Sequence, residues 1–272
     1  MDEDHRGRHT KDGIRIYDPA DFAGMHAAGA LAARILDDVA PLVFVGQTTT
    51  AIDAAITQMV EDAGATSATI GYKGYKHASC ISVNHVVCHG IPSDKRLKDG
   101  DILNIDVTVI VDGWFGDTSR MYVAGKLPRK AERLIQVTHD ALMLGIEAVK
   151  PGNTFGDIGH AIQTYAEAHR MSVVRDFCGH GLGRVFHAPP NVLHYGRPGT
   201  AAVLEEGMFF TIEPMVNLGR PETKTLADDW TAVTRDKSLS AQFEHSIGVT
   251  ATGAEIFTLS PGGRYHPTYP AE

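Results

Sequence analysis

The chain has 272 residues, of which 43% are hydrophobic and 21% charged, and a formal net charge of −8 at pH 7. This composition is ordinary for a soluble globular protein, and the negative charge gives no reason to expect a nucleic acid or an anionic membrane as a partner. No stretch approaches the roughly 18 unbroken apolar residues that span a membrane, and the polar start lacks the apolar core of a secretory signal. Three cysteines are too few for a disulfide framework and are typical of a reducing compartment. We therefore expect a cytoplasmic protein with a flexible N-terminal extension over residues 1–12 and a single domain over residues 13–272.

Four helices are predicted in chain order, over residues 19–40, 50–63, 128–149 and 155–169. The first is rich in alanine and has Asp18 as its cap and Pro19 in its first turn. The third ends before Pro151 and Gly152, a pair that terminates helices. Between the second and third helices the sequence is typical of strands.

Two strands in this middle segment, 101–111 and 116–123, are rich in Ile and Val or alternate in polarity. Asp112-Gly113 between them is typical of a two-residue hairpin turn. With such a turn, Asp106 and Asp117 become diagonal neighbours on one face of the hairpin. The pairs expected to lie directly opposite each other are Asp106 with Ser119 and Thr108 with Asp117.

The second half of the chain repeats blocks of the first half in the same order. VGQTTTAIDAAI (45–56) matches PGNTFGDIGHAI (151–162), and CHGIP (88–92) matches FHAPP (186–190). LKDGDILNID (97–106) matches LEEGMFFTIE (204–213). A repeat of roughly 100 residues is far longer than the period of a solenoid, so it predicts two related halves instead of an array. The expected pseudo-repeats cover about 18–125 and 126–255.

The repeat pairs Glu213 with Asp106 and Glu244 with Asp117, which brings four carboxylates together at the joint between the halves. Four like charges in an apolar sheet require compensation, and two divalent cations would balance them. A carboxylate-rich set suits Mn²⁺, Fe²⁺, Co²⁺ or Zn²⁺, and a two-metal site activates a bridging hydroxide as a nucleophile. Each acid taken singly would be interpreted as a surface residue of a half-exposed strand; the duplication favours the metal site.

Three histidines accompany this cluster. His180 lies within Gly179–Gly183, where glycines on both sides let the backbone approach closely, although a loop with an incidental histidine has the same appearance. His89 and His187 are paired by the repeat, and each is followed by Pro at the third position. A histidine near a metal but not bound to it can donate to a developing oxyanion or to the leaving group.

From about Ile14 to Leu259 the chain resembles the type I methionine aminopeptidases. The motifs that carry the resemblance are GYKGY (71–75), CISVNHVVCHGIP (80–92), LNIDVTVIVDGWFGDTSRM (103–121), CGHGLGRVFHAPP (178–190), FTIEPM (210–215) and WTAVTRDKSLSAQFEHSI (230–247). The resemblance implies an α+β, pita-bread fold, in which two halves related by a pseudo-two-fold axis form a curved, mainly antiparallel sheet covered by helices.

The resemblance also implies an enzyme that removes the N-terminal methionine from nascent peptides with a small second residue. Two divalent metal ions (Co, Mn, Fe or Zn) would be bound by Asp106, Asp117, His180, Glu213 and Glu244. A metal-bridging water would attack the first peptide carbonyl, Glu213 would shuttle the proton, and His89 and His187 would steady the intermediate. The methionine pocket would be formed by Tyr72, Tyr75, Cys80, Phe186 and Trp230, together with the two catalytic histidines. The ribosome surface is a further partner implied by this role, and we expect a monomer.

Some residues depart from the family pattern. Thr69 stands where many relatives have Cys on the pocket wall, Lys76-His77 replaces a usual Pro-Lys, and His85 replaces a common Glu. Ala-Pro-Pro follows His187 in place of an acidic pair. These changes bear on the shape of the pocket and on its tolerance for bulky second residues. Two alternatives stay open at this point: an X-Pro aminopeptidase or dipeptidase of the same fold, and a binding protein that has lost catalysis.

Overall fold

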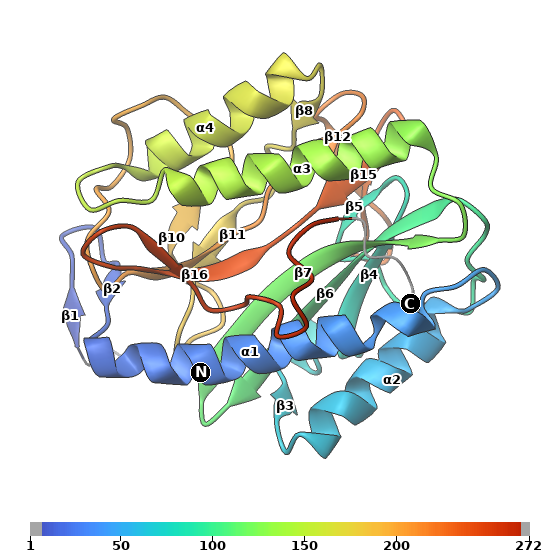
Figure 1. Cartoon of the computed structure of the whole chain (residues 1–272), viewed down its shortest axis with the longest axis horizontal. Helices are drawn as coiled ribbons and strands as arrows, with labels where there is room; N and C mark the ends of the chain where they lie inside the picture. Colours follow the sequence, from blue (N-terminus) through green and yellow to red (C-terminus); the bar gives the residue numbers. More distant parts are fainter. Residues whose placement is uncertain (1–6, 268–272) are drawn as a thin grey trace.

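The computed structural model describes residues 7–267, and Figure 1 shows long helices around a set of antiparallel strands. The helices are α1 (Phe22–Asp38), α2 (Thr49–Asp62), α3 (Arg129–Glu147) and α4 (Phe155–Ala168), with short 3₁₀ turns at Pro19–Asp21, Ala40–Leu42 and Tyr72–Gly74. All four predicted helices are confirmed. The first differs at its start, where Pro19 opens a 3₁₀ turn and the α-helix begins at Phe22. No helix within residues 7–267 is long and apolar enough to cross a membrane.

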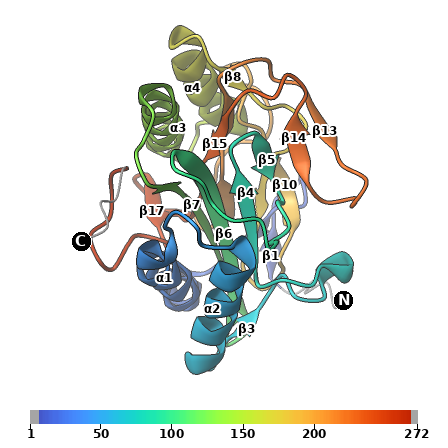
Figure 2. The same cartoon turned by 90° about the vertical axis from the view of Figure 1, so that its right-hand side faces the viewer.

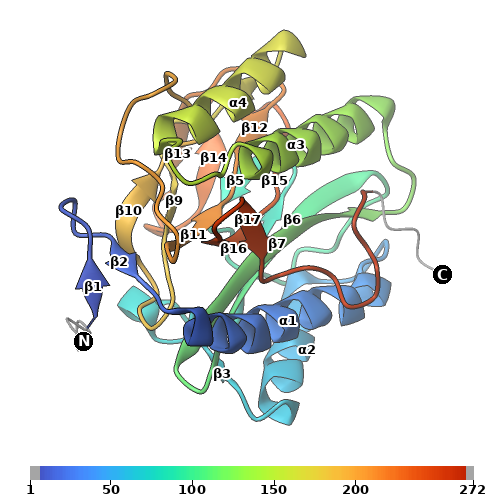
Figure 3. The same cartoon turned by 60° about the vertical axis from the view of Figure 1, so that its left-hand side comes forward.

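The strands are short except for two long neighbours in the first half. They are β1 (Arg8–His9), β2 (Arg15–Ile16), β3 (Thr66–Ser67), β4 (Ser79–Val83), β5 (Val86–Cys88), β6 (Asp101–Val111), β7 (Trp114–Ala124), β8 (Ser172–Val173), β9 (Gly179–Gly181), β10 (Ala188–Val192), β11 (Phe209–Ile212), β12 (Met215–Asn217), β13 (Thr223–Thr225), β14 (Ala232–Thr234), β15 (Ser240–Gln242), β16 (His245–Val249) and β17 (Ala254–Ile256). The pairings of these strands are antiparallel. Figure 3 shows the β1–β2 hairpin at the periphery of the molecule. Part of the predicted extension, residues 1–6, lies outside the described residues, and the domain limits stay a prediction.

The long hairpin β6–β7 has the predicted register. Asp106 lies opposite Ser119, and Asp117 lies opposite Thr108. Asp112 adopts a positive φ of 48° in the two-residue turn, a conformation that Asp tolerates better than most residues. The turn therefore sets which face of the hairpin carries the two acids.

The two halves are built alike, as the sequence repeat predicts. Thr48 caps α2 and Thr154 caps α4 at equivalent positions. Gly46 and Gly152, two residues before the caps, both have positive φ, 95° and 92°. Each half also has its own apolar core: one packs α1 and α2 against β4, β6 and β7, and the other packs α3 and α4 against β11, β12 and β16.

The halves meet where β7 lies beside β16. Ser119 and Glu244 form an antiparallel bridge there, and the Ser246 hydroxyl donates to the backbone oxygen of Asp117 at 2.6 Å. Figure 1 shows α1 and α2 on one side of this joint and α3 and α4 on the other. Figure 2 shows α1 and α3 together on one face of the strands, with β10, β13 and β14 on the opposite side. The joint therefore lies between the sheet that contains β6 and β7 and the sheet that contains β11 and β16.

Candidate metal centre and substrate pocket

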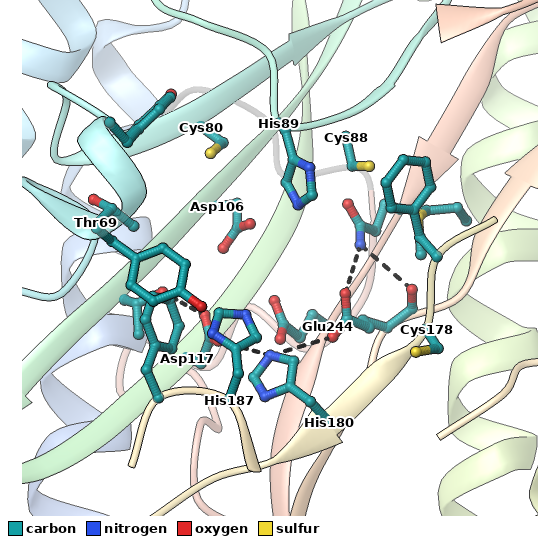
Figure 4. Close-up of a pocket in the computed structure, with 18 of the residues that line it drawn as sticks. Thr69, Cys80, Cys88, His89, Asp106, Asp117, Cys178, His180, His187 and Glu244 are labelled. Carbon is teal, nitrogen blue, oxygen red and sulfur yellow. Dashed lines mark hydrogen bonds and ion pairs between the residues drawn. The ribbon is translucent and has the colours of Figure 1, made fainter. Parts of the chain in front are cut away.

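A pocket of about 650 Å³ lies at the joint between the halves. It is lined by every residue that the sequence predicts to bind metal or substrate: Tyr72, Tyr75, Cys80, His89, Asp106, Asp117, His180, Phe186, His187, Glu213, Trp230 and Glu244. Figure 4 shows that Asp106, Asp117, His180 and Glu244 converge on one region of it, although they come from separate strands and loops. The fold thus brings the predicted residues together; their individual roles stay predictions.

Asp117 and Glu244 form the centre of the cluster. The carboxylates of both residues are buried, and with His180 they offer ligand atoms that all lie within 4.8 Å of one another. Thr108 Oγ1 donates to Asp117 Oδ1 at 2.7 Å, while the Thr118 hydroxyl donates to the backbone oxygen of Glu244 at 2.7 Å. The neighbouring threonines therefore fix the two acids without neutralising their charges.

His180 is held so that its Nε2 faces the carboxylates. Its backbone N–H donates to Thr211 Oγ1 at 3.0 Å, and its Nδ1 lies 3.2 Å from the Gly181 oxygen. Nε2 is then 3.5 Å from Asp117 Oδ2 and 3.7 Å from Glu213 Oε1. A Cβ on Gly181 would lie 2.1 Å from the Pro189 oxygen, which explains the glycine there. Burial opposes the imidazolium, but the contact with Asp117 and the charge of Glu213 outweigh it and raise the pKa of His180.

Glu213 follows β11 and is held on three sides. Thr211 Oγ1 donates to its Oε1 at 2.7 Å, and Gln242 Nε2 lies 3.3 Å from its Oε2. Its backbone N–H donates to Nε2 of His194 at 3.0 Å. His194 is completely buried, and burial lowers its pKa to about 3, so the ring is neutral and its Nε2 can accept.

His180 alone cannot balance the negative charge of four buried carboxylates. Burial, followed by the charges of neighbouring acids, raises the pKa values of Asp106 and Glu244 well above their usual range. Burial likewise raises the pKa of Glu213 to about 7. Oδ1 of Asp106 is buried without a hydrogen-bond partner, and the one Lys or Arg among the described lining residues, Lys73, is exposed. Four carboxylates and one imidazole form a set of ligands that fits divalent cations, and the unpartnered oxygen of Asp106 is free to bind one.

Aromatic rings form the wall beside the cluster. The ring centroids of Tyr75 and Trp230 lie 4.8 Å apart, and those of Tyr72 and Phe186 lie 4.9 Å apart. Cys80, on β4, is buried beside Tyr75. Flat rings next to a sulfur atom make a surface that suits an unbranched apolar side chain, and a thioether in particular.

His89 and His187 lie beside the acids Asp106, Asp117 and Glu244, as Figure 4 shows. The ring of His187 stacks on Tyr72 at 5.1 Å and lies 4.2 Å from the ring of His180, while His89 contacts Phe177 edge to face at 5.4 Å. Burial lowers the pKa of both, that of His187 to about 4. At neutral pH each is therefore a neutral imidazole that can donate one N–H.

Three residues of the site were missed by sequence reasoning. His194 and Gln242 hold Glu213, and Phe177 packs on His89. Gln242 shares a strand face with Glu244 in the sequence pattern, a signal that could have identified it. His194 and Phe177 come from irregular segments, where no periodicity indicates which way a side chain points.

Comparison with known proteins identifies the family. A profile of metallopeptidase family M24 matches residues 23–251. The methionine aminopeptidase of Rickettsia prowazekii is 57% identical over 257 residues, which cover 94% of this chain and 99% of the relative. The crystal structure of methionine aminopeptidase from the same organism superposes with a TM-score of 0.90, covering 90% of this chain and 100% of that one.

A more distant solved structure shares the fold alone. The X-Pro aminopeptidase of Thermotoga maritima has a TM-score of 0.72 at 17% identity, covering 90% of this chain and 63% of that one. These matches confirm the predicted pita-bread fold and the predicted enzyme class. The chain belongs to metallopeptidase family M24 and, within it, to the methionine aminopeptidases.

Proposed function

We propose that this protein removes the N-terminal methionine from nascent polypeptides, with a preference for a small second residue. Two divalent ions would be bound by Asp106, Asp117, His180, Glu213 and Glu244. A cytoplasmic location, a monomeric state and contact with the ribosome surface go with this role as predictions from the sequence.

The metal ions, when bound, would supply a water molecule acidic enough to act as a nucleophile at neutral pH. Asp117 and Glu244 would hold the ions from the two halves of the chain, because their ligand atoms lie within 4.8 Å of one another at the joint. Thr108 orients Asp117 through its 2.7 Å hydrogen bond. Oxygen ligands with a single imidazole accept Mn²⁺, Fe²⁺, Co²⁺ or Zn²⁺, so availability in the cell would select the ion.

Glu213 would accept the proton of the attacking water and pass it to the leaving amine. Thr211 and Gln242 hold its carboxylate on opposite oxygens, which keeps it in one orientation during both transfers. His89 and His187, both neutral, would donate N–H groups to the oxygen on which negative charge develops.

The methionine side chain would lie between the Tyr75–Trp230 pair and the Tyr72–Phe186 pair, against Cys80. Such contacts of a thioether with ring faces contribute about 0.3–1.5 kcal/mol each. We attribute the preference for a small second residue to the narrow approach between the loops that carry His89 and His187.

One observation carries the proposal: the unpartnered Oδ1 of Asp106 in a cluster of four acids, inside the same pocket as the aromatic wall. The test is to strip the protein of metal and reload it separately with Mn²⁺, Fe²⁺, Co²⁺ and Zn²⁺. Initial rates are then measured on Met-Ala-Ser, Met-Leu-Ser and an Ala-Pro peptide, with Asp106→Asn as the inactive control. We expect metal-dependent release of methionine, faster from Met-Ala-Ser. Preferred cleavage of the Ala-Pro peptide would reverse the assignment, and inactivity with every metal would favour a binding role.

A further inference from the structure

Asp53, on α2, is a buried carboxylate that the proposed mechanism does not use. It is 6% exposed and, within the described part of the chain, is not among the residues that line the pocket. A buried carboxylate is costly unless hydrogen-bond donors meet it, so the identity of its partners indicates what it does.

All three contacts of this carboxylate go to one short segment. Its Oδ1 accepts from the Ser79 backbone N–H at 2.9 Å and from the Ser79 hydroxyl at 2.8 Å. Its Oδ2 lies 2.9 Å from Nδ1 of His77. The Asp53 carboxylate therefore holds residues 77–79 against α2 through these contacts, at the start of β4.

The same segment holds two side chains of the pocket wall. The Thr69 hydroxyl donates to the His77 backbone oxygen at 2.7 Å. The Tyr75 hydroxyl donates to the Ser79 backbone oxygen at 2.9 Å. Both Thr69 and Tyr75 line the pocket. Displacement of residues 77–79 would consequently remove the acceptor of Thr69 and the nearer acceptor of Tyr75.

Through Tyr75, a displacement of residues 77–79 would also reach Trp230 and the loop next to His89. Its ring packs on Trp230 at 4.8 Å, and its hydroxyl lies 3.4 Å from the Gly90 oxygen, directly after His89. Tyr75 is only 4% exposed, so its position is set by these contacts and not by solvent. The orientation of the Tyr75–Trp230 pair thus depends on where Ser79 is held.

We propose that Asp53 is a positioning residue that fixes the wall against which the substrate's methionine side chain packs. This inference rests on the proposed function. In the structure, Asp53 contacts neither the predicted metal ligands nor the predicted catalytic histidines. Its loss should therefore weaken the binding of methionine without changing the rate of the hydrolytic step. A raised KM at nearly constant kcat is the expected signature.

The test compares Asp53→Ala, Asp53→Asn and His77→Ala with a control on the same helix, Asp62→Asn. Asp62 is exposed and contacts Gln58 one turn away. With Mn²⁺-loaded proteins and Met-Ala-Ser, we expect Asp53→Ala to raise KM about tenfold, equivalent to about 1.4 kcal/mol, with kcat within about twofold of wild type. Asp53→Asn keeps an oxygen for Ser79 and should raise KM less. His77→Ala should also have a smaller effect, and the control none.

A second readout does not depend on turnover. Free L-methionine is titrated into the Mn²⁺-loaded proteins while tryptophan emission is followed, because Trp230 lies in the pocket wall, whereas Trp114, the other tryptophan, packs in a separate cluster. We expect Asp53→Ala to raise the dissociation constant about tenfold at unchanged manganese content. Unchanged KM and methionine affinity would overturn the inference, as would a loss confined to kcat or to bound metal.

Two further outcomes are informative. If Asp53→Ala does not fold, Asp53→Asn and His77→Ala carry the test, and wild-type KM in both would overturn the inference. If wild type prefers the Ala-Pro peptide, the proposed function fails by itself, and the effect of Asp53 is then measured on the KM for that peptide.

Discussion

Replacing Glu244 by glutamine should change stability in opposite directions with and without metal. Glu244 is 3% exposed, and its ligand oxygen lies within 4.8 Å of that of Asp117. Two ionised carboxylates at this separation repel each other by about 3 kcal/mol at an effective dielectric constant of about 20. Glutamine has the same shape and removes this repulsion. We therefore expect metal-free Glu244→Gln at pH 8 to be more stable than metal-free wild type by about 1–3 kcal/mol, because partial protonation already relieves some of the repulsion in wild type.

Metal should reverse this order. A ligand present at about 1,000 times its dissociation constant stabilises the native state by about 4 kcal/mol, and each kcal/mol shifts the Tm of a chain of this size by about 2–4 °C. Wild type should gain this stabilisation from Mn²⁺, and Glu244→Gln should gain little. Thermal unfolding followed by circular dichroism, in EDTA and in MnCl₂, measures both effects, with the exposed Glu206→Gln as the control. A metal-free variant less stable than wild type, or equal shifts with Mn²⁺ in both proteins, would refute the reasoning.

Three further predictions follow from single side chains. His187→Ala should lower kcat about 100-fold, as expected for loss of a donor to a developing oxyanion, while the metal content measured by atomic emission stays that of wild type. Burial lowers the pKa of His194 to about 3 from 6.5, so between these values the unfolded chain binds more protons than the folded one and stability falls as the pH drops. In urea unfolding of the metal-free protein, His194→Gln should remove about 2 kcal/mol of the stability change between pH 7 and pH 5, and an unaltered pH dependence would contradict this. Gly90→Ala should reduce both stability and activity, because the added Cβ would lie 2.3 Å from the Ile81 oxygen and displace the loop next to His89. Wild-type kinetics in that variant would show that the loop tolerates the displacement.

The parts of the fold that depend on local pattern were predictable from the sequence. The Asp112-Gly113 turn and the alternation of the flanking strands predict that Asp106 lies opposite Ser119, and the structure has this register. The repeat predicts the counterpart of each acid, because equivalent positions in related halves face the same joint.

Other parts depend on packing between distant segments and have no local signal. Whether His194 accepts from Glu213, or Asp53 from Ser79, is decided by packing between segments whose contacting residues are 19 and 26 positions apart in the chain. A single sequence contains no periodicity that reports such contacts. The four acids could be proposed as metal ligands because their charge must be compensated, and the family resemblance added His180. Thr108 and Gln242 share strand faces with the acids in the sequence pattern, whereas His194 has no such signal.

The bridge between Ser119 and Glu244 would link metal binding at the predicted centre to the alignment of the two halves. Neither half alone supplies more than two of the four acids, so the predicted metal centre requires β7 and β16 to remain side by side. Any motion that separates these two strands would move the predicted ligands apart, and bound ions would oppose that separation. Bound ions would thus add their binding free energy to the free energy that is needed to separate the halves.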